Sequence, residues 1–142
     1  MKRLTLCGSL LAIVGSAIGF TMPATAIPAI YRKTTDVISL PALDDVLLIV
    51  HQFTVPAGSR VINYSVTAAN SGLIEYVRCG VRANGTFLSQ HAAVVGGGYA
   101  STISGVTSYD SRVPYTLDLV CFHNGGYNSI PIIDRYAEVA VY

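Results

Sequence analysis

The chain has 142 residues, 51% of them hydrophobic, and its formal net charge is +1. This length suits one small domain. The near-neutral charge lacks the basic excess that is typical of nucleic-acid-binding proteins, and Lys and Arg form no cluster of the kind that binds anionic lipid. The composition therefore argues against a nucleic acid partner and against a lipid surface.

Residues 1–26 have the pattern of a signal peptide. Two basic residues follow the first methionine, residues 4–20 are apolar or small and carry no charge, and an Ala-x-Ala motif ends at Ala26. We expect cleavage after Ala26 and a mature domain of residues 27–142. No apolar run after Ala26 is long enough to cross a bilayer. The pattern predicts a secreted, extracellular protein, or a periplasmic one in a Gram-negative cell.

The rest of the chain alternates in the manner of β-strands that are separated by turns. Residues 27–33 read as an irregular entry segment, and Asn84-Gly85 is a strong hairpin signal. Alternation places Leu47, Ile49 and Arg135 on the core faces of their strands. The expected strands are residues 34–40, 46–55, 61–69, 74–83, 86–93, 101–106, 113–123 and 133–142, with a turn at 108–112.

Cys79 and Cys121 are the two cysteines that remain after cleavage, because Cys7 belongs to the signal peptide. Cysteines of an exported protein meet an oxidising compartment and normally pair there. Cys79 lies between Val77 and Val81 on one face of a strand, and Cys121 lies on a similar apolar face. We therefore predict a disulfide between two core strands that face each other.

The spacing of the strands predicts the fold class. No window shows a sustained helical period, and turn signals recur at intervals of about 8–12 residues. These features indicate an all-β, two-sheet antiparallel sandwich with jelly-roll or Greek-key connections. An immunoglobulin-like sandwich is the alternative, and the absence of Trp counts against it.

Four short motifs carry a resemblance to a known group of proteins. They are Val55-Pro56-Ala57-Gly58-Ser59, Val77-x-Cys79-x-Val81, Leu119-x-Cys121 and Ala137-x-Val139-x-Val141. Together they resemble small exported bacterial β-sandwich proteins of jelly-roll type, whose function is unassigned. They are similar, more distantly, to the jelly-roll heads of tumour-necrosis-factor-like proteins. The resemblance implies a fold and carries over no catalytic residue.

The sequence contains no recognisable catalytic, metal-binding or cofactor-binding pattern. His51, His91 and His123 are too far apart in the chain for a local metal-ligand spacing. The three glycines at 96–98 lack the Gly-Lys-Ser/Thr ending of a phosphate-binding loop. We predict no cofactor and no metal, and favour a non-enzymatic protein, while the enzyme alternative stays open.

The expected function is binding or assembly outside the cell, with an extracellular protein or a glycan as the partner. Self-association into a homo-oligomer stays open. A small secreted hydrolase or a lectin-like carbohydrate-binding module is one alternative, and a secreted toxin or inhibitor is another.

The up-and-down course of the strands predicts where a partner binds. The loops at residues 70–72, 94–99 and 124–131 each close a strand that runs in the same direction, so we expect them at one end of the sandwich. Loops on a rigid scaffold often carry binding residues, and tyrosine suits such surfaces. The candidate binding residues are Gly97, Tyr99, Asn124 and Tyr127.

Overall fold

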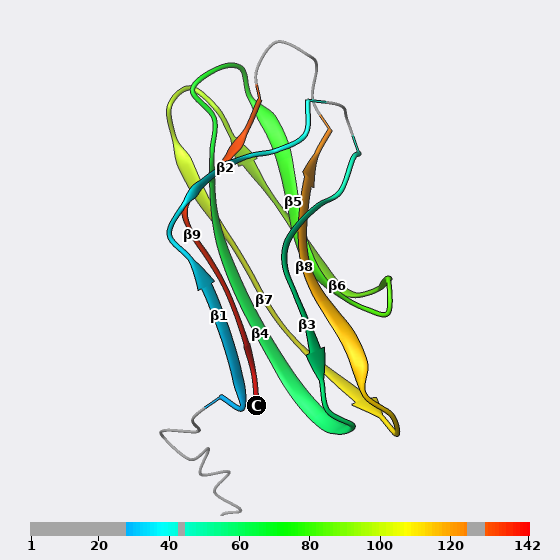
Figure 1. Ribbon diagram of the computed structural model, residues 1–142. Helices are drawn as coiled ribbons and strands as arrows, with labels where there is room; N and C mark the ends of the chain where they lie inside the picture. The colour runs from blue at the N-terminus through cyan, green and yellow to red at the C-terminus, as the bar shows by residue number, and fades with distance from the viewer. Residues whose placement is uncertain (1–27, 43–44, 125–129) are drawn as a thin grey trace, which may run out of the picture.

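The computed structural model describes residues 28–42, 45–124 and 130–142, so the predicted signal peptide and Tyr127 lie outside it. The described residues form two antiparallel sheets (Figure 1). The strands are β1 (Ile30–Thr34), β2 (Val37–Ser39), β3 (Leu48–Val55), β4 (Gly58–Ala69), β5 (Glu75–Ala83), β6 (Thr86–Val95), β7 (Ala100–Ser111), β8 (Tyr115–His123) and β9 (Ile132–Val141). Within these ranges no helix has the length and apolarity that crossing a membrane requires.

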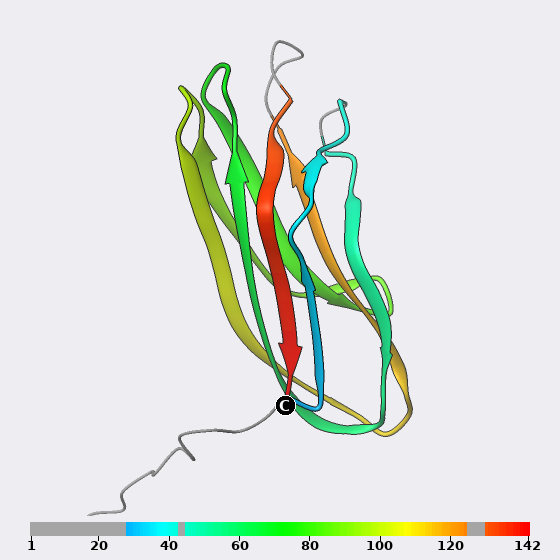
Figure 2. The same ribbon diagram turned by 60° about the vertical axis from the view of Figure 1, so that its left-hand side comes forward.

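The order of the strands defines a jelly roll. The five-stranded sheet runs β1-β9-β4-β7, with β2 also paired to β9, and the four-stranded sheet runs β3-β8-β5-β6. Figure 2 presents the five-stranded sheet, from blue β1 past red β9 and green β4 to yellow-green β7. The pairs β5·β6, β4·β7, β3·β8 and β1·β9 are nested within one another. The chain is therefore one antiparallel ribbon, rolled into two sheets.

The ribbon turns back on itself at the hairpin that the sequence predicts. Ala83 pairs with Thr86, and the two residues between them have positive φ angles, 48° at Asn84 and 83° at Gly85. A two-residue turn with both φ angles positive has the twist that continues into the strands on either side. The Asn-Gly pair thus fixes the register of the innermost pair of the ribbon.

Alternating residues of both sheets fill the core, as predicted for the central strands. On β4, the residues at even positions from Ile62 to Ala68 are buried, and on β5 the same holds for the odd positions from Val77 to Val81. The largest buried side chains include Ile62, Tyr115, Leu117, Leu119 and Ile133. Burial of this apolar area is the main favourable term in folding.

The disulfide joins Cys79 to Cys121, but not across the core. The two cysteines lie directly opposite each other on β5 and β8, neighbouring strands of the four-stranded sheet. Their Cα atoms are 4.2 Å apart, close to the spacing of a non-hydrogen-bonded pair in an antiparallel ladder. The expectation that these strands face each other is therefore wrong, since they lie side by side.

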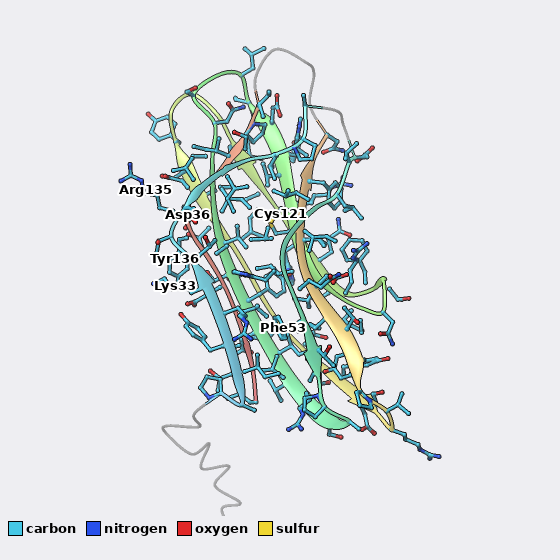
Figure 3. The ribbon with its side chains drawn as sticks, in the orientation of Figure 1. Lys33, Asp36, Phe53, Cys121, Arg135 and Tyr136 are labelled. Atoms are coloured by element: carbon cyan, nitrogen blue, oxygen red, sulfur yellow. A yellow bond between two sulfur atoms is a disulfide. The ribbon has the colours of Figure 1, made fainter. Side chains whose placement is uncertain are left out.

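Two irregular registers put residues on faces that simple alternation does not predict. In β3 the pairing with β8 shifts between Ile49 and His51, and both Leu47 and Ile49 are exposed instead of facing the core. In β9 the pairing with β4 shifts beside Arg135, which has a φ of 56° and points outward (Figure 3). Because side chains alternate with period two, the irregularity in β3 exchanges the faces on either side of it, so that Leu48 and Val50 pack against the core as Phe53 does. In β9 the irregularity turns Arg135 outward, while Ile133 and Ala137 on either side stay buried.

Several element boundaries also differ from the prediction: the expected strand 34–40 is divided between β1 and β2, and β6 continues to Val95 instead of ending at 93. The expected entry segment at 27–33 covers most of β1, a strand with three exposed positions whose partner among the described residues is β9. The expected turn at 108–112 is mostly strand, because β7 continues to Ser111 along the whole of β4. Pairing with a long partner strand outweighs the weak strand propensity of these polar residues.

Candidate functional site

The loops that were predicted to share one end do so in the described residues. Two loops, residues 70–74 between β4 and β5 and residues 96–99 between β6 and β7, contact each other directly. The Gly97 amide donates to the Gly72 carbonyl oxygen at 2.9 Å, and the Gly98 amide donates to the Asn70 carbonyl oxygen at 3.0 Å. Both loops lie at the top of Figure 1.

The third loop of this end begins at Asn124. Its amide donates to the Tyr76 carbonyl oxygen on β5 at 3.3 Å, which places Asn124 beside the strand that follows the first loop. Tyr127, the remaining candidate, lies outside the described residues. The described residues thus bring Gly97, Tyr99 and Asn124 to one end of the sandwich.

Gly96 allows the first two loops to meet backbone to backbone. A Cβ atom at this position would lie 2.6 Å from the Ile74 Cα and 2.7 Å from the Leu73 carbonyl oxygen. Its φ of 153° also disfavours any L side chain. A close contact of this kind holds the backbone of both loops in one arrangement.

The tips of these two loops expose three large apolar side chains. Leu73 is 63% exposed, Ile74 73% and Tyr99 78%. We call these three residues the apolar tip. Single exposed apolar residues are ordinary on protein surfaces, but several on adjoining loops indicate an interaction site. Sequence reasoning found Tyr99 and missed Leu73 and Ile74, because they precede β5 and read as the start of that strand.

A buried Glu-His pair lies beneath this end. His123 Nε2 is 2.7 Å from the Pro41 carbonyl oxygen, and His123 Nδ1 is 2.9 Å from Glu75 Oε2. A carbonyl oxygen only accepts, so Nε2 is the donor to Pro41, and Nδ1 faces the carboxyl group of Glu75. Both side chains are buried. The pair therefore connects β5, β8 and the segment before β3, out of reach of a substrate.

The three histidines do not assemble into one site. His51 Nε2 lies 3.3 Å from the Ala137 carbonyl oxygen, and His91 Nδ1 lies 2.6 Å from the Tyr64 hydroxyl group, whose pKa is raised by burial. His123 has the partners described above. Among the described residues no three His, Cys, Asp or Glu side chains gather in a way that could hold a metal ion.

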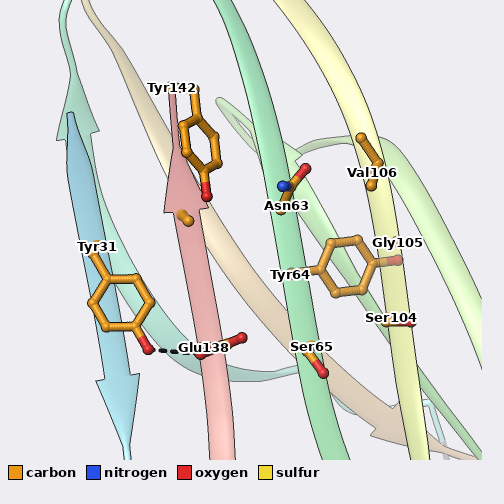
Figure 4. Close-up of a pocket in the computed structure, with 10 residues that line it drawn as sticks. Tyr31, Asn63, Tyr64, Ser65, Ser104, Gly105, Val106, Glu138 and Tyr142 are labelled. Carbon is orange, nitrogen blue, oxygen red and sulfur yellow. Dashed lines mark hydrogen bonds between the residues drawn. The ribbon is translucent and has the colours of Figure 1, made fainter. Parts of the chain in front are cut away.

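A second candidate site, which sequence reasoning missed, is a hollow of about 320 Å³ on the outer face of the five-stranded sheet (Figure 4). One row of directly opposite residues, Tyr31, Ala140, Asn63 and Val106, crosses four strands beneath it. Because Ala140 has the smallest side chain of the row, the sheet is open between Tyr31 and Asn63. We call this feature the Ala140 hollow.

The neighbouring row on the same face supplies polar groups. It consists of Lys33, Glu138, Ser65 and Ser104, again on β1, β9, β4 and β7. Of these, Glu138, Ser65 and Ser104 line the hollow, and Tyr142 lines it from beyond the first row. The polar face of β9 is visible in the sequence. The residues that lie beside Glu138 come from strands far apart in the chain, so the sequence does not show that they meet.

Glu138 connects the tyrosines of this face. The Tyr31 hydroxyl donates to Glu138 Oε2 at 2.6 Å, and this hydrogen bond raises the pKa of Tyr31. A hydrogen bond with Glu138 likewise raises the pKa of Tyr136 to about 12. Lys33 Nζ lies 4.9 Å from the centre of the Tyr136 ring, beside it in Figure 3. The carboxylate is thus held at the edge of the hollow by side chains of β1 and β9.

The outer face of the four-stranded sheet is built differently. There Asp118 accepts hydrogen bonds from Gln52 Nε2 at 2.8 Å and from the Arg82 guanidinium at 2.9 Å. The Arg82 guanidinium also lies 5.9 Å from the centre of the Phe87 ring. Phe122, on the same face, is only 7% exposed. The side chains of this row thus bind one another across β3, β8 and β5.

Comparison with known proteins leaves the family open. No family model and no curated protein matches the chain. Among solved structures it is similar to the CBM36-1 domain of a multidomain xylanase from the hindgut metagenome of Trinervitermes trinervoides, with a TM-score of 0.42 and 10% identity over 77% of this chain and 97% of that one. It is also similar to a chain of the T13 IBDV viral particle, with a TM-score of 0.42 and 13% identity over 88% of this chain and 38% of that one. The function is therefore inferred from the chain's own residues.

Proposed function

We propose that this chain is an exported, non-enzymatic binding protein that engages a protein partner through the apolar tip. The observation that carries the proposal is the exposure of Leu73, Ile74 and Tyr99 on two loops that are hydrogen-bonded to each other. Exposed apolar area gains roughly 25 cal/mol for each Å² that a partner removes from water. Gly97 and Asn124 belong to the same end and border the contact.

The fixed arrangement of the loops favours binding. Association requires that mobile side chains and loops become ordered, and that ordering opposes affinity. The contact of Gly96 with the backbone of Ile74 and the bonds of Gly97 and Gly98 order these loops before any partner arrives. Tyr99 then offers a large amphipathic ring with few rotatable bonds.

The charge around the tip favours a protein over a lipid surface. Residues 70–74 and 96–99 contain no Lys or Arg, whereas segments that bind anionic membranes carry basic clusters. A toxin or an inhibitor would use the same tip, and would differ only in the protein that it contacts.

Export accounts for the remaining features of the chain. A signal peptide in residues 1–26, removed after Ala26, would deliver residues 27–142 to an extracellular or periplasmic space. The buried disulfide between Cys79 and Cys121 suits an oxidising compartment of that kind.

A photo-crosslinking experiment tests the proposal on the exported chain. Intact mass first establishes whether the protein in the medium starts at Ile27, and a species that retains residues 1–26 contradicts the export step. A photoreactive phenylalanine analogue then replaces Tyr99, or Val113 at the opposite end as the control. We expect a defined protein to crosslink from position 99 and not from position 113.

Competition by unlabelled variants adds specificity to this result. Each unlabelled protein is added as a competitor for the crosslinked partner. The triple variant Leu73→Ser, Ile74→Ser, Tyr99→Ser should compete about thirtyfold more weakly than wild type, because it loses a binding hot spot of about 2 kcal/mol. Its melting temperature should stay close to that of wild type, because all three side chains are exposed. Equal crosslinking from both positions, or equal competition by the triple variant, refutes the proposal.

A further inference from the structure

We propose that the Ala140 hollow is a second binding site, separate from the apolar tip, and that its ligand is a neutral saccharide. The hollow lies on strands of the five-stranded sheet, whereas the tip belongs to loops at one end (Figures 1 and 4). Its volume of about 320 Å³ is at the lower end of the range for small-molecule pockets.

The walls of the hollow combine flat apolar surface with hydrogen-bonding groups. Tyr31 and Tyr142 contribute aromatic rings, and Ala140 and Val106 contribute aliphatic surface. A sugar ring is amphipathic in the same sense, because its C–H faces are apolar and its hydroxyl groups lie around the edge. Aromatic rings with polar tips suit a ligand that is apolar on one side and polar on the other.

The polar groups around the hollow have hydrogen-bonding capacity to spare. Asn63 Oδ1 is buried and has no hydrogen-bond partner among the described residues, and an unpaired buried acceptor costs free energy until a donor reaches it. Ser65 and Ser104 each supply a hydroxyl group that both donates and accepts. Glu138 is hydrogen-bonded to Tyr31 and Tyr136, but a carboxylate has about four acceptor sites. Such a set matches the many hydroxyl groups of a saccharide.

The charge of the site separates a neutral sugar from ionic ligands. Among the described residues that line the hollow, Glu138 has the one charged side chain, and Lys33 is opposite it on the neighbouring strand. A lone carboxylate repels phosphate and sulfate groups. The Glu138 carboxylate already accepts a hydrogen bond from a tyrosine hydroxyl, so it is not a free negative charge of the kind that selects a cation. The site therefore favours a ligand that forms neutral hydrogen bonds.

The strands hold these groups in place before a ligand arrives. Tyr31, Asn63, Ser104 and Glu138 lie within β1, β4, β7 and β9, whose ladders fix their backbones. Side chains on regular strands need little reordering on binding, which preserves affinity for a small ligand.

A filling substitution is the sharpest test. The wild-type protein is applied to an array of neutral oligosaccharides, and the strongest neutral binder is titrated by calorimetry into each variant. Ala140→Leu fills the hollow from its floor, and we expect it to weaken binding by about tenfold or more. Thr102→Leu adds the same side chain to an exposed position of the same sheet outside the hollow, and it should leave the affinity within about twofold.

Further variants and probe ligands test the saccharide site independently of Ala140→Leu. If Ala140→Leu does not fold, Tyr142→Ala and Asn63→Ala remove a wall and the free acceptor, and each should weaken binding. The triple variant of the apolar tip should bind the saccharide as wild type does, which separates this proposal from the protein-partner function. Lack of binding to every neutral glycan, or unchanged affinity in Ala140→Leu, overturns the proposal. Heparin fragments and benzyltrimethylammonium serve as anionic and cationic probes, and binding of either that is stronger than binding of the neutral glycan also overturns it.

Discussion

The outer faces of the two sheets are built from similar rows of residues but make opposite kinds of surface. On the four-stranded sheet, Gln52, Asp118 and Arg82 lie directly opposite one another, and their polar groups bind each other. On the five-stranded sheet, Tyr31, Ala140 and Asn63 occupy the equivalent kind of row, and the small middle residue leaves a hollow. We call the outer face of the four-stranded sheet the closed face, because the polar groups of its row bind one another. We call the outer face of the five-stranded sheet the open face, because the small side chain of Ala140 leaves a hollow between larger neighbours.

The disulfide belongs to the closed sheet, and its removal should give the largest effect. Cys79→Ala with Cys121→Ala should lower the free energy of unfolding by about 4 kcal/mol, because the bond closes a loop over a sequence separation of 42. Urea denaturation measures the change. Wild-type protein reduced with dithiothreitol is the control that separates the lost bond from the smaller side chains. A loss below about 1 kcal/mol in both would contradict this account.

Opening the closed face should have the next largest effect. Asp118 is 3% exposed, so Asp118→Ala leaves Arg82 and Gln52 without their acceptor and should cost about 3 kcal/mol of unfolding free energy. The matched change on the open face, Ser104→Ala, should stay within about 0.5 kcal/mol of wild type, because Ser104 is exposed. Similar losses in the two variants, measured by urea denaturation, would abolish the distinction between the faces.

The smallest effect concerns protonation on the open face. The pKa of Tyr136 is raised to about 12 in the folded protein, above a value near 10 in the unfolded chain. The neutral hydroxyl therefore contributes stability in full below pH of about 10, and that contribution is lost as the pH rises to about 12. Because the side chain is only partly buried, solvent screening keeps the effect small.

Titration of tyrosine absorbance in the ultraviolet tests this assignment. Glu138→Gln should shift the pKa of Tyr136 back toward about 10, because the carboxylate no longer opposes ionisation. Ser65→Ala, which leaves Glu138 in place on the same face, should keep the high pKa. An unchanged late titration in Glu138→Gln would show that the carboxylate is not its cause.

The sequence predicts those parts of the fold in which local pattern and tertiary pairing agree. The alternation of β4 and β5, the Asn84-Gly85 turn and the cysteine pair all follow from the period and from turn chemistry. The faces of Ile49 and Arg135 do not follow, because register irregularities arise between strands.

The candidate sites divide in the same way. The end that carries Tyr99 follows from counting strand directions, which the turn signals supply. The Ala140 hollow does not, because Tyr31, Asn63 and Val106 meet Ala140 only through the order of the strands and their register. Polar positions on the solvent face of a strand look alike until their neighbours are known.

The nested ribbon also places the first and last strands' outer ends, at Ile30 and Val141, at the end of the sandwich opposite the apolar tip. Ile30 pairs with Val141, which in turn pairs with Ile62 near the start of β4, whereas Ala69, from which the first tip loop leaves, pairs with Ile132. Any segment attached before Ile30 or after Val141 thus leaves from the pole opposite the apolar tip (Figure 1). A tether or fused domain at either position would hold the protein at the end opposite the apolar tip. The tip would then point away from the attachment, and the Ala140 hollow would remain accessible on the side of the sandwich.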